Sequence, residues 1–244
     1  MTHTNVKRRG SYGYDGPYLL PILGLLIAAA VVIGVLSETV WPFIGAVAIF
    51  ACAGLDFYAT RRGKFVVWGR VLDQLHLQGD KEILDLGCGR GAILLLAAQH
   101  LTTGHAVGID LWRRQDQSGN SIQVAEQNAR LEGVADRVEL RTADMTDLPF
   151  EDESFDLVIS NLAIHNVTRD KRYKAIEEAI RVLRPGGRLM IGDLWSTKRY
   201  VRELHRLDIS DVSRRDLGWR MWFSGPWART MLVSCTKSRG PSHE

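Results

Sequence analysis

A glycine-rich turn is the first feature of the sequence that points to chemistry. The stretch ILDLGCGRG carries Gly87, Gly89 and Gly91 where a short apolar run passes into a helical pattern. Glycines at such a position let backbone N–H groups approach a ligand closely at the N-terminus of a helix. The spacing is G-x-G-x-G, whereas a dinucleotide site has G-x-G-x-x-G, so the turn by itself identifies no ligand.

Two aspartates strengthen this interpretation because each ends a predicted strand. Asp110 follows the glycine turn by about twenty residues, a spacing at which a carboxylate accepts hydrogen bonds from ribose hydroxyls. Asp144 ends the next predicted strand in TADMTDLPF. The alternative is that the glycines only make a tight connection and the aspartates only cap helices. Glycine and acidic features at three successive strand ends favour the binding site.

The elements that hold these residues are short aliphatic runs alternating with longer amphipathic stretches. From Lys81 onward this alternation is typical of a parallel sheet with helices on both faces, and it predicts an α/β fold. Asn120 is predicted to cap the second helix, Gly133 to follow its end, and the PGG at 185–187 to break the third. The predicted strands are EILDLG, HAVGID, RVELRTAD, FDLVISN, RLMIGDL and MLVSCTK, and the predicted helices cover residues 92–99, 121–132 and 172–183.

The chain from about Glu82 to Leu194 resembles the class I S-adenosyl-L-methionine (SAM)-dependent methyltransferases, in the branch similar to the ubiquinone and menaquinone methyltransferases. The motifs that carry the resemblance are ILDLGCGRG, GIDL, TADMTDLPFEDESFDLVISNLAIHNV and AIRVLRPGGRLMIGDL. The resemblance implies a Rossmann-like sheet and SAM as the cofactor. It says much less about the methyl acceptor.

The resemblance also implies roles for individual residues in the cofactor site. Asn161 would lie beside the sulfonium and the acceptor. The other implied contacts are Asp85, Gly87 and Gly89 with the methionine part, Asp110 with the ribose, Asp144 and Met145 with the adenine, and Leu111 or Trp112 packed on the adenine face.

His165 is the candidate general base, and with Asn161 it forms the predicted catalytic pair. It follows the fourth predicted strand in SNLAIHNV, at the mouth of the site, where a neutral imidazole can take a proton from a phenol or thiol. The alternative is a histidine that only hydrogen-bonds a loop backbone. Methyl transfer from a sulfonium requires no metal, and the three cysteines have no metal-ligand spacing, so no metal site is predicted.

Two long apolar runs precede the predicted enzyme domain. Residues 19–36 and 40–55 carry no charge and are separated only by SET, and each run spans most of a ~30 Å hydrocarbon layer as a helix. A cleaved signal peptide does not explain two runs. The other alternative, a buried core hairpin, is weakened because both runs are apolar on all sides, where a surface helix would show a polar face. The sequence therefore predicts a two-helix transmembrane hairpin over residues 18–58.

Basic flanks set the expected orientation and the domain organisation. VKRRG at 6–10 and TRRGK at 60–64 place both termini and the catalytic domain in the cytoplasm, as a multi-pass membrane protein. The predicted organisation is a basic tail (1–17), the hairpin (18–58), a juxtamembrane linker or helix (59–79) and the methyltransferase domain (80–244). On this division, SAM binding is expected to survive the loss of residues 1–58.

Three classes of function remain open at the level of sequence. The favoured one is methylation of an apolar small-molecule acceptor such as a quinol, phenol or thiol, and the alternatives are a phospholipid amine N-methyltransferase and a SAM-binding membrane scaffold without activity. The net charge of +3, and SNLA in place of an N-P-P-Y motif, argue against nucleic acid. The aromatic cluster GWRMWFSGPW at 218–227 has three possible roles: it packs in the core, lines a pocket for the acceptor, or rests against the bilayer interface. The oligomeric state is not predicted.

Overall fold

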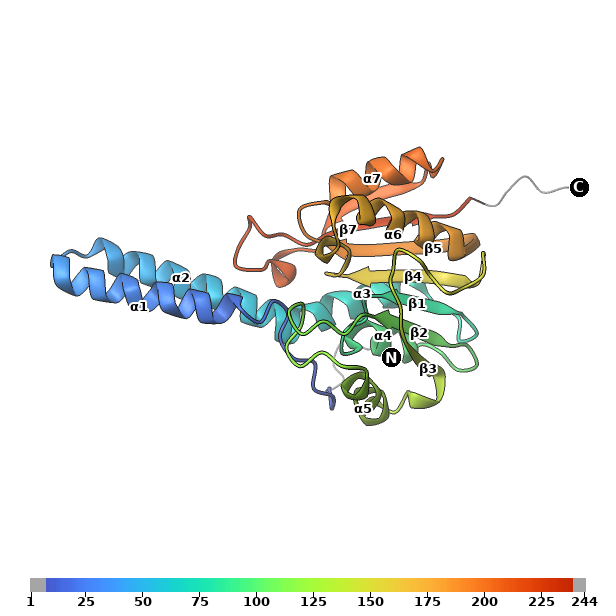
Figure 1. Ribbon diagram of the computed structural model, residues 1–244, viewed down its shortest axis with the longest axis horizontal. Helices are drawn as coiled ribbons and strands as arrows, with labels where there is room; N and C mark the ends of the chain where they lie inside the picture. Colours follow the sequence, from blue (N-terminus) through green and yellow to red (C-terminus); the bar gives the residue numbers. More distant parts are fainter. Residues whose placement is uncertain (1–7, 239–244) are drawn as a thin grey trace, which may run out of the picture.

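A helical hairpin projects from one end of an α/β domain (Figure 1). The computed structural model describes residues 8–238, so Val6 and Lys7 of the first basic flank lie outside the described residues. The hairpin consists of α1 (Leu19–Ser37) and α2 (Trp41–Tyr58), which run side by side. Both helices are long and apolar enough to cross a membrane. Most of their exposed side chains are apolar, among them Leu25, Val35, Leu36, Val47 and Phe50.

The second helix of the hairpin continues directly into the core of the domain. After α2, one π-helical turn, η2 (Ala59–Gly63), leads into α3 (Lys64–Leu75), so the helical stretch from Trp41 covers 35 residues. Trp68 and Leu72 on α3 are fully buried. The hairpin is therefore joined to the domain by a continuous helical stretch.

A seven-stranded sheet forms the centre of the domain, in the order β3-β2-β1-β4-β5-β7-β6. The first five strands in this order are parallel, and β7 runs antiparallel to both β5 and β6. The α/β prediction is confirmed, with β7 as the one reversed strand. The strands are β1 (Ile83–Leu86), β2 (Ala106–Asp110), β3 (Val138–Thr142), β4 (Phe155–Asn161), β5 (Leu183–Asp193), β6 (Val212–Asp216) and β7 (Met231–Thr236).

Helices cover both faces of the sheet and enclose two apolar cores. The core on one face includes side chains of α3, α4 and α5, and the core on the other includes side chains of α6 and α7. The helices are α4 (Ala92–Ala98), α5 (Ile122–Glu132), α6 (Arg169–Val182) and α7 (Thr197–Arg206), and short 3-10 turns are η3 (Ala135–Arg137), η4 (Ile164–Asn166) and η5 (Trp219–Met221).

Two local predictions about helix ends were wrong. The cap of α5 is Ser121, whose Oγ accepts a hydrogen bond from Val124 N at 3.3 Å, while Asn120 turns its amide toward the second strand. Gly133 does end α5, with φ of 74°. The PGG at 185–187 lies inside β5, because α6 already ends at Val182 and the strand absorbs Gly186 as an irregularity with φ of 82°.

The segment ahead of the hairpin, residues 8–18, packs across the domain and is called the strap here. Its Tyr12 is buried, and the backbone N–H groups of Gly10 and Ser11 donate to side chains of α5 at 2.9 and 2.8 Å. Ser118 N donates to Tyr14 O at 3.0 Å. The strap is therefore fastened to the loop between β2 and α5 and to α5 itself.

Candidate active site

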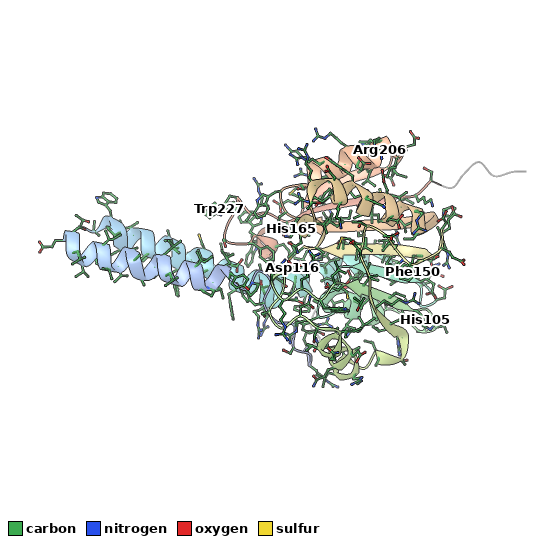
Figure 2. All side chains as sticks on the ribbon, viewed as in Figure 1. His105, Asp116, Phe150, His165, Arg206 and Trp227 are labelled. Atoms are coloured by element: carbon green, nitrogen blue, oxygen red, sulfur yellow. The ribbon has the colours of Figure 1, made fainter. Side chains whose placement is uncertain are left out.

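The carboxyl ends of the parallel strands point toward the hairpin (Figure 1). Figure 2 shows His165, Asp116 and Trp227 on this side of the domain, whereas His105 and Phe150 lie at the opposite end. Ligands of open parallel sheets bind outside the carboxyl ends of the strands. The site predicted from sequence therefore lies where the hairpin meets the domain.

The glycine turn between β1 and α4 has the backbone that only glycine adopts without strain. Gly87, Gly89 and Gly91 have φ values of 73°, 52° and 83°. A Cβ at Gly87 would lie 2.3 Å from Ala163, and one at Gly89 would lie 2.6 Å from the Gln117 side chain. Both positions exclude a side chain, so the turn stays open to the cavity it borders.

Asp110 at the end of β2 ties the glycine turn to the loop that follows. Its Oδ2 accepts a hydrogen bond from Gly89 N at 2.9 Å, and its Oδ1 accepts from Trp112 N at 2.5 Å and from Asn120 Nδ2 at 3.2 Å. A carboxylate has about four acceptor positions, so Oδ2 retains one for a ligand hydroxyl. Asp110 therefore positions the loop after β2 and can still accept a hydrogen bond from a ligand.

For the SAM site implied by the resemblance, Asp110→Ala is expected to weaken SAM binding by about 1.5–3 kcal/mol, the range for hydrogen bonds to a charged group. The ribose contact and the bond to Gly89 N are lost together. Isothermal titration calorimetry on the full chain measures the change. An unchanged SAM affinity would remove Asp110 from the ribose site.

Asp85, the last residue but one of β1, is a buried carboxyl group. It is 2% exposed and lines the same cavity. Burial, followed by the nearby charge of Asp110, raises the pKa of Asp85 to about 8. A cationic ligand beside it favours the ionised carboxylate, which suits the sulfonium and ammonium charges of SAM.

Without ligand, the raised pKa of Asp85 makes the protein less stable as the pH rises. Its folded-state pKa of about 8 lies above the ordinary 3.8, so the proton it retains stabilises the fold below about pH 4 and this contribution is lost toward pH 8. Asp85→Asn is expected to flatten this part of the profile. Between pH 5 and pH 8 the Tm of wild type should fall by roughly several °C more than the Tm of the variant. Melting curves in detergent without SAM test this, and parallel profiles would contradict it.

The residues predicted for the adenine end lie together on the cavity wall. Leu111, Asp144 and Met145 all line the cavity. Asp144 Oδ1 accepts hydrogen bonds from Thr146 N and Oγ1 at 2.9 and 2.8 Å, which fixes the turn after β3. Trp112 instead donates its Nε1–H to Thr142 Oγ1 at 2.7 Å. Of the two residues predicted for the adenine face, Leu111 is the one in the wall.

Asn161 ends β4 and is held by a helix that the sequence did not connect to the site. Its Oδ1 accepts a hydrogen bond from Trp68 Nε1 of α3 at 2.8 Å. Asn161 lines the cavity, and the fixed Oδ1 leaves its amide N–H groups for other partners. Together the glycine turn, a free acceptor position on Asp110, the buried Asp85 and the apolar wall fit SAM.

His165 on η4 pairs with a buried carboxylate. Its Nδ1 lies 2.5 Å from Asp193 Oδ1, and its backbone N donates to Asp193 Oδ2 at 3.1 Å. Asp193 is fully buried and also accepts from Tyr200 Oη at 2.9 Å and from Leu194 N at 2.7 Å. A carboxylate on Nδ1–H leaves Nε2 as the basic nitrogen. Sequence reasoning missed Asp193, although its place at the end of a strand in IGDL was the available signal.

A second cavity of about 390 Å³ adjoins the first. His165 lines it, with side-chain exposure of 22%, and the two cavities share four wall residues. The shared residues are Asp15, Asp116, Leu162 and Asn166. Its other wall residues include the apolar side chains Leu19, Leu194, Trp195, Phe223, Trp227 and Ala228. A cavity of this size accommodates a ring-sized apolar molecule next to the cofactor.

The aromatic cluster at 218–227 is divided between core and surface. Phe223 is buried and lines the second cavity, while Trp227 lines it with 68% exposure. Trp219 is half exposed and its ring stacks on Tyr58 at the end of α2, 5.2 Å between centroids. The cluster therefore joins the hairpin to the mouth of the second cavity.

Residues on both sides of the hairpin also line the first cavity. The domain division predicted from the sequence did not include them in the cofactor site. Asp15 of the strap and Lys64 of α3 both line it. Deletion of residues 1–58 would remove Asp15 from the wall, so weaker SAM binding is now the expected result of this deletion. Among residues 8–238, no group of three or more His, Cys, Asp or Glu side chains is placed to hold a metal ion.

Comparisons with known proteins agree with this geometry. The family model described as a methyltransferase domain matches residues 77–215, more than half of the chain. The chain is 36% identical over 122 residues to a demethylmenaquinone methyltransferase of Lactiplantibacillus plantarum, covering 50% of this chain and 48% of that protein. It is 35% identical over 121 residues to a ubiquinone/menaquinone biosynthesis C-methyltransferase, UbiE, of Roseobacter denitrificans, covering 50% and 45%. The chain thus spans about half the length of these curated relatives.

Solved structures show the same fold at low sequence identity. The [4+2]-cyclase SpnF is 21% identical with a TM-score of 0.57, covering 70% of this chain and 81% of that one. Geranyl diphosphate methyltransferase in complex with SAM is 18% identical with a TM-score of 0.57, covering 72% and 87%. The chain therefore belongs to the methyltransferase-domain family, in the class I SAM-dependent group, and SAM is its cofactor.

Proposed function

We propose that this chain is a membrane-anchored methyltransferase that moves a methyl group from SAM to an apolar small molecule such as a quinol, phenol or thiol. The observation that carries the proposal is the second cavity, which adjoins the cofactor cavity and has several apolar side chains in its wall at the base of the hairpin. Two relatives named for quinone methylation, at 36% and 35% identity, support a quinol as the acceptor.

His165 acts as the general base in this proposal. When bound, SAM supplies an electrophilic methyl group on a sulfonium. Asp193 accepts from His165 Nδ1–H and fixes the ring, so Nε2 takes the proton from an acceptor hydroxyl or thiol in the second cavity. The buried Asp193 then stabilises the imidazolium that forms.

The remaining residues align the reactants and exclude water. Leu162 and Asn166 lie in the walls of both cavities, so they form the boundary at which acceptor and cofactor meet. The strap covers the loop between β2 and α5. Alignment of the attacking atom with the methyl carbon supplies much of the acceleration in such a displacement.

The hairpin serves as the membrane anchor in this proposal. Exposed apolar side chains cover α1 and α2, and the exposed Arg61 and Arg62 follow α2 at its domain end. Positive charge on this side supports a cytoplasmic location of the domain in this proposal. Exposed Tyr18, Trp219 and Trp227 around the base are the residue types favoured at the membrane interface.

A phospholipid amine is the second candidate acceptor. The observation that favours it is the presence of three carboxylates, Asp15, Asp56 and Asp116, in the wall of the second cavity. Carboxylates attract an ammonium group, which a quinol or a phenol does not carry. Asp15 and Asp56 are already engaged by Lys64 and Tyr14, which makes the amine the weaker candidate.

Mass spectrometry of membrane extracts incubated with the chain and methyl-labelled SAM tests the proposal. Label in a quinol, phenol or thiol is the expected result. Label in methylated phospholipid would instead establish the second candidate. SAM binding without label in any extracted compound would refute both enzymatic proposals and support a scaffold.

A further inference from the structure

Lys64 is a buried cation in the cofactor cavity that the mechanism above does not use. Its side chain is 1% exposed, and it begins α3 directly after the π-helical turn. Its Nζ donates a hydrogen bond to Asp15 Oδ2 at 2.7 Å. Removing the Lys64 ammonium from water costs more free energy than one contact with the partly buried Asp15 usually returns, so a buried cation facing a cavity calls for a further role.

Each carboxylate oxygen of Asp15 already accepts a hydrogen bond, whereas Lys64 retains N–H donors. Asp15 Oδ1 accepts from Gln117 Nε2 at 2.8 Å, while Oδ2 accepts from Lys64. An ammonium group has three N–H donors, and Asp15 takes one of them. Asp15 therefore holds Lys64 in place and leaves donors for a ligand in the cavity that both residues line.

Two chains of contacts place Lys64 at the glycine-turn end of the cavity. Gln117, which bonds Asp15, accepts from Arg90 N at 2.8 Å and packs against Gly89. One helical turn after Lys64, Trp68 of the same helix bonds Asn161 at the end of β4. The methionine part of SAM is expected between the glycine turn and Asn161, and its carboxylate needs a cation.

We propose that Lys64 binds the α-carboxylate of SAM and that Asp15 is the positioning residue for it. Arg113 also lines the cavity, but its side chain is exposed to solvent, so its charge is the more strongly screened. Lys64 is thereby a cofactor-binding residue, outside the glycine turn and outside the strand ends. The inference rests on SAM as cofactor and not on the identity of the acceptor.

The pair also connects the hairpin to the cofactor. Asp15 lies ahead of α1, and Lys64 lies behind α2, so their contact closes the base of the hairpin. Tyr14 donates its O–H to Asp56 of α2 next to this contact. The cofactor site is complete only while the two ends of the hairpin are held together.

Calorimetry with two cofactor analogues tests the role of Lys64. The full chain in detergent is titrated with SAM and with decarboxylated SAM, which lacks only the carboxylate. Wild type is expected to bind SAM about 10–100-fold more tightly, as for a hydrogen-bonded charge pair. Lys64→Met is expected to lose this preference by weakening SAM alone, and Lys64→Arg is expected to retain part of it.

Lys81→Met is the matched control, because Lys81 pairs with Asp80 and Asp156 away from the cavity. The preference of this variant for SAM over decarboxylated SAM should equal that of wild type. Melting curves without ligand show whether each variant is folded. A Lys64→Met variant that keeps the wild-type ratio of the two affinities would overturn the proposal. Equal affinity of wild type for both analogues would overturn it as well, whether or not the variant folds.

Discussion

Replacing His165 with glutamine is expected to lower turnover by about 10²–10⁴-fold, the usual contribution of a general base, with little change in SAM affinity. Glutamine retains an amide that can reach Asp193 but has no basic nitrogen. The loss should shrink for acceptors that are already ionised, since their proton is gone before they bind. Initial rates with a phenol series of falling pKa, together with calorimetry for SAM, measure both effects.

His105→Gln is the matched control, because His105 is exposed at the opposite end of the domain (Figure 2). Asp193→Asn tests the positioning role, since an amide no longer fixes the tautomer that leaves Nε2 basic. Its loss should appear in kcat at each pH and should disappear with the ionised acceptors. Equal turnover of His165→Gln and wild type across the series would exclude His165 from the mechanism.

The second large effect is expected when the hairpin is excised: turnover of membrane-dissolved acceptors should fall, and turnover of water-soluble ones should not. Residues 20–54 are replaced by a short Gly-Ser loop, which keeps the strap, Asp56 and the contact of Asp15 with Lys64. Anchoring raises the effective concentration of an apolar acceptor at the site, so turnover of a long-chain acceptor in vesicles should fall about 10²-fold or more. Turnover of a small water-soluble phenol should change little.

SAM affinity serves as the control for this excision, and it should match that of wild type. Deletion of the whole segment 1–58 should in contrast weaken SAM binding, because Asp15 is lost with it. If the excised chain methylates both acceptors as fast as wild type, the hairpin has no delivery role. If the intact chain is fully extracted from membranes at alkaline pH, the hairpin is not a membrane anchor.

The sequence was sufficient where the pattern is local. All six predicted strands are present, because aliphatic runs bounded by glycine and aspartate repeat along the chain. β6 was missed because its residues, VSRRD, are mostly exposed and carry no apolar alternation. The Gly-Tyr-rich strap likewise has no periodicity, and only its contacts with α5 give it structure.

The pairs that complete the site are distant in sequence, and this is why they were not predicted. Asp193 lies 28 positions from His165, and Lys64 lies 49 positions from Asp15. Each residue alone has an ordinary role, Asp193 as the end of a strand and Lys64 as part of a basic flank. Only the sheet order, and the helix that runs from α2 into α3, bring the partners together.

The most direct measurement of the central claim compares methyl transfer within and between vesicles. The chain is reconstituted into vesicles with labelled SAM outside, and a hydroquinone with a long isoprenoid tail is placed either in the same vesicles or in separate ones. If the enzyme takes its acceptor from the surrounding bilayer, the hydroquinone should be labelled fast in the same vesicles and little in the separate ones. Equal labelling of the hydroquinone in both arrangements, or none in either, would contradict the account.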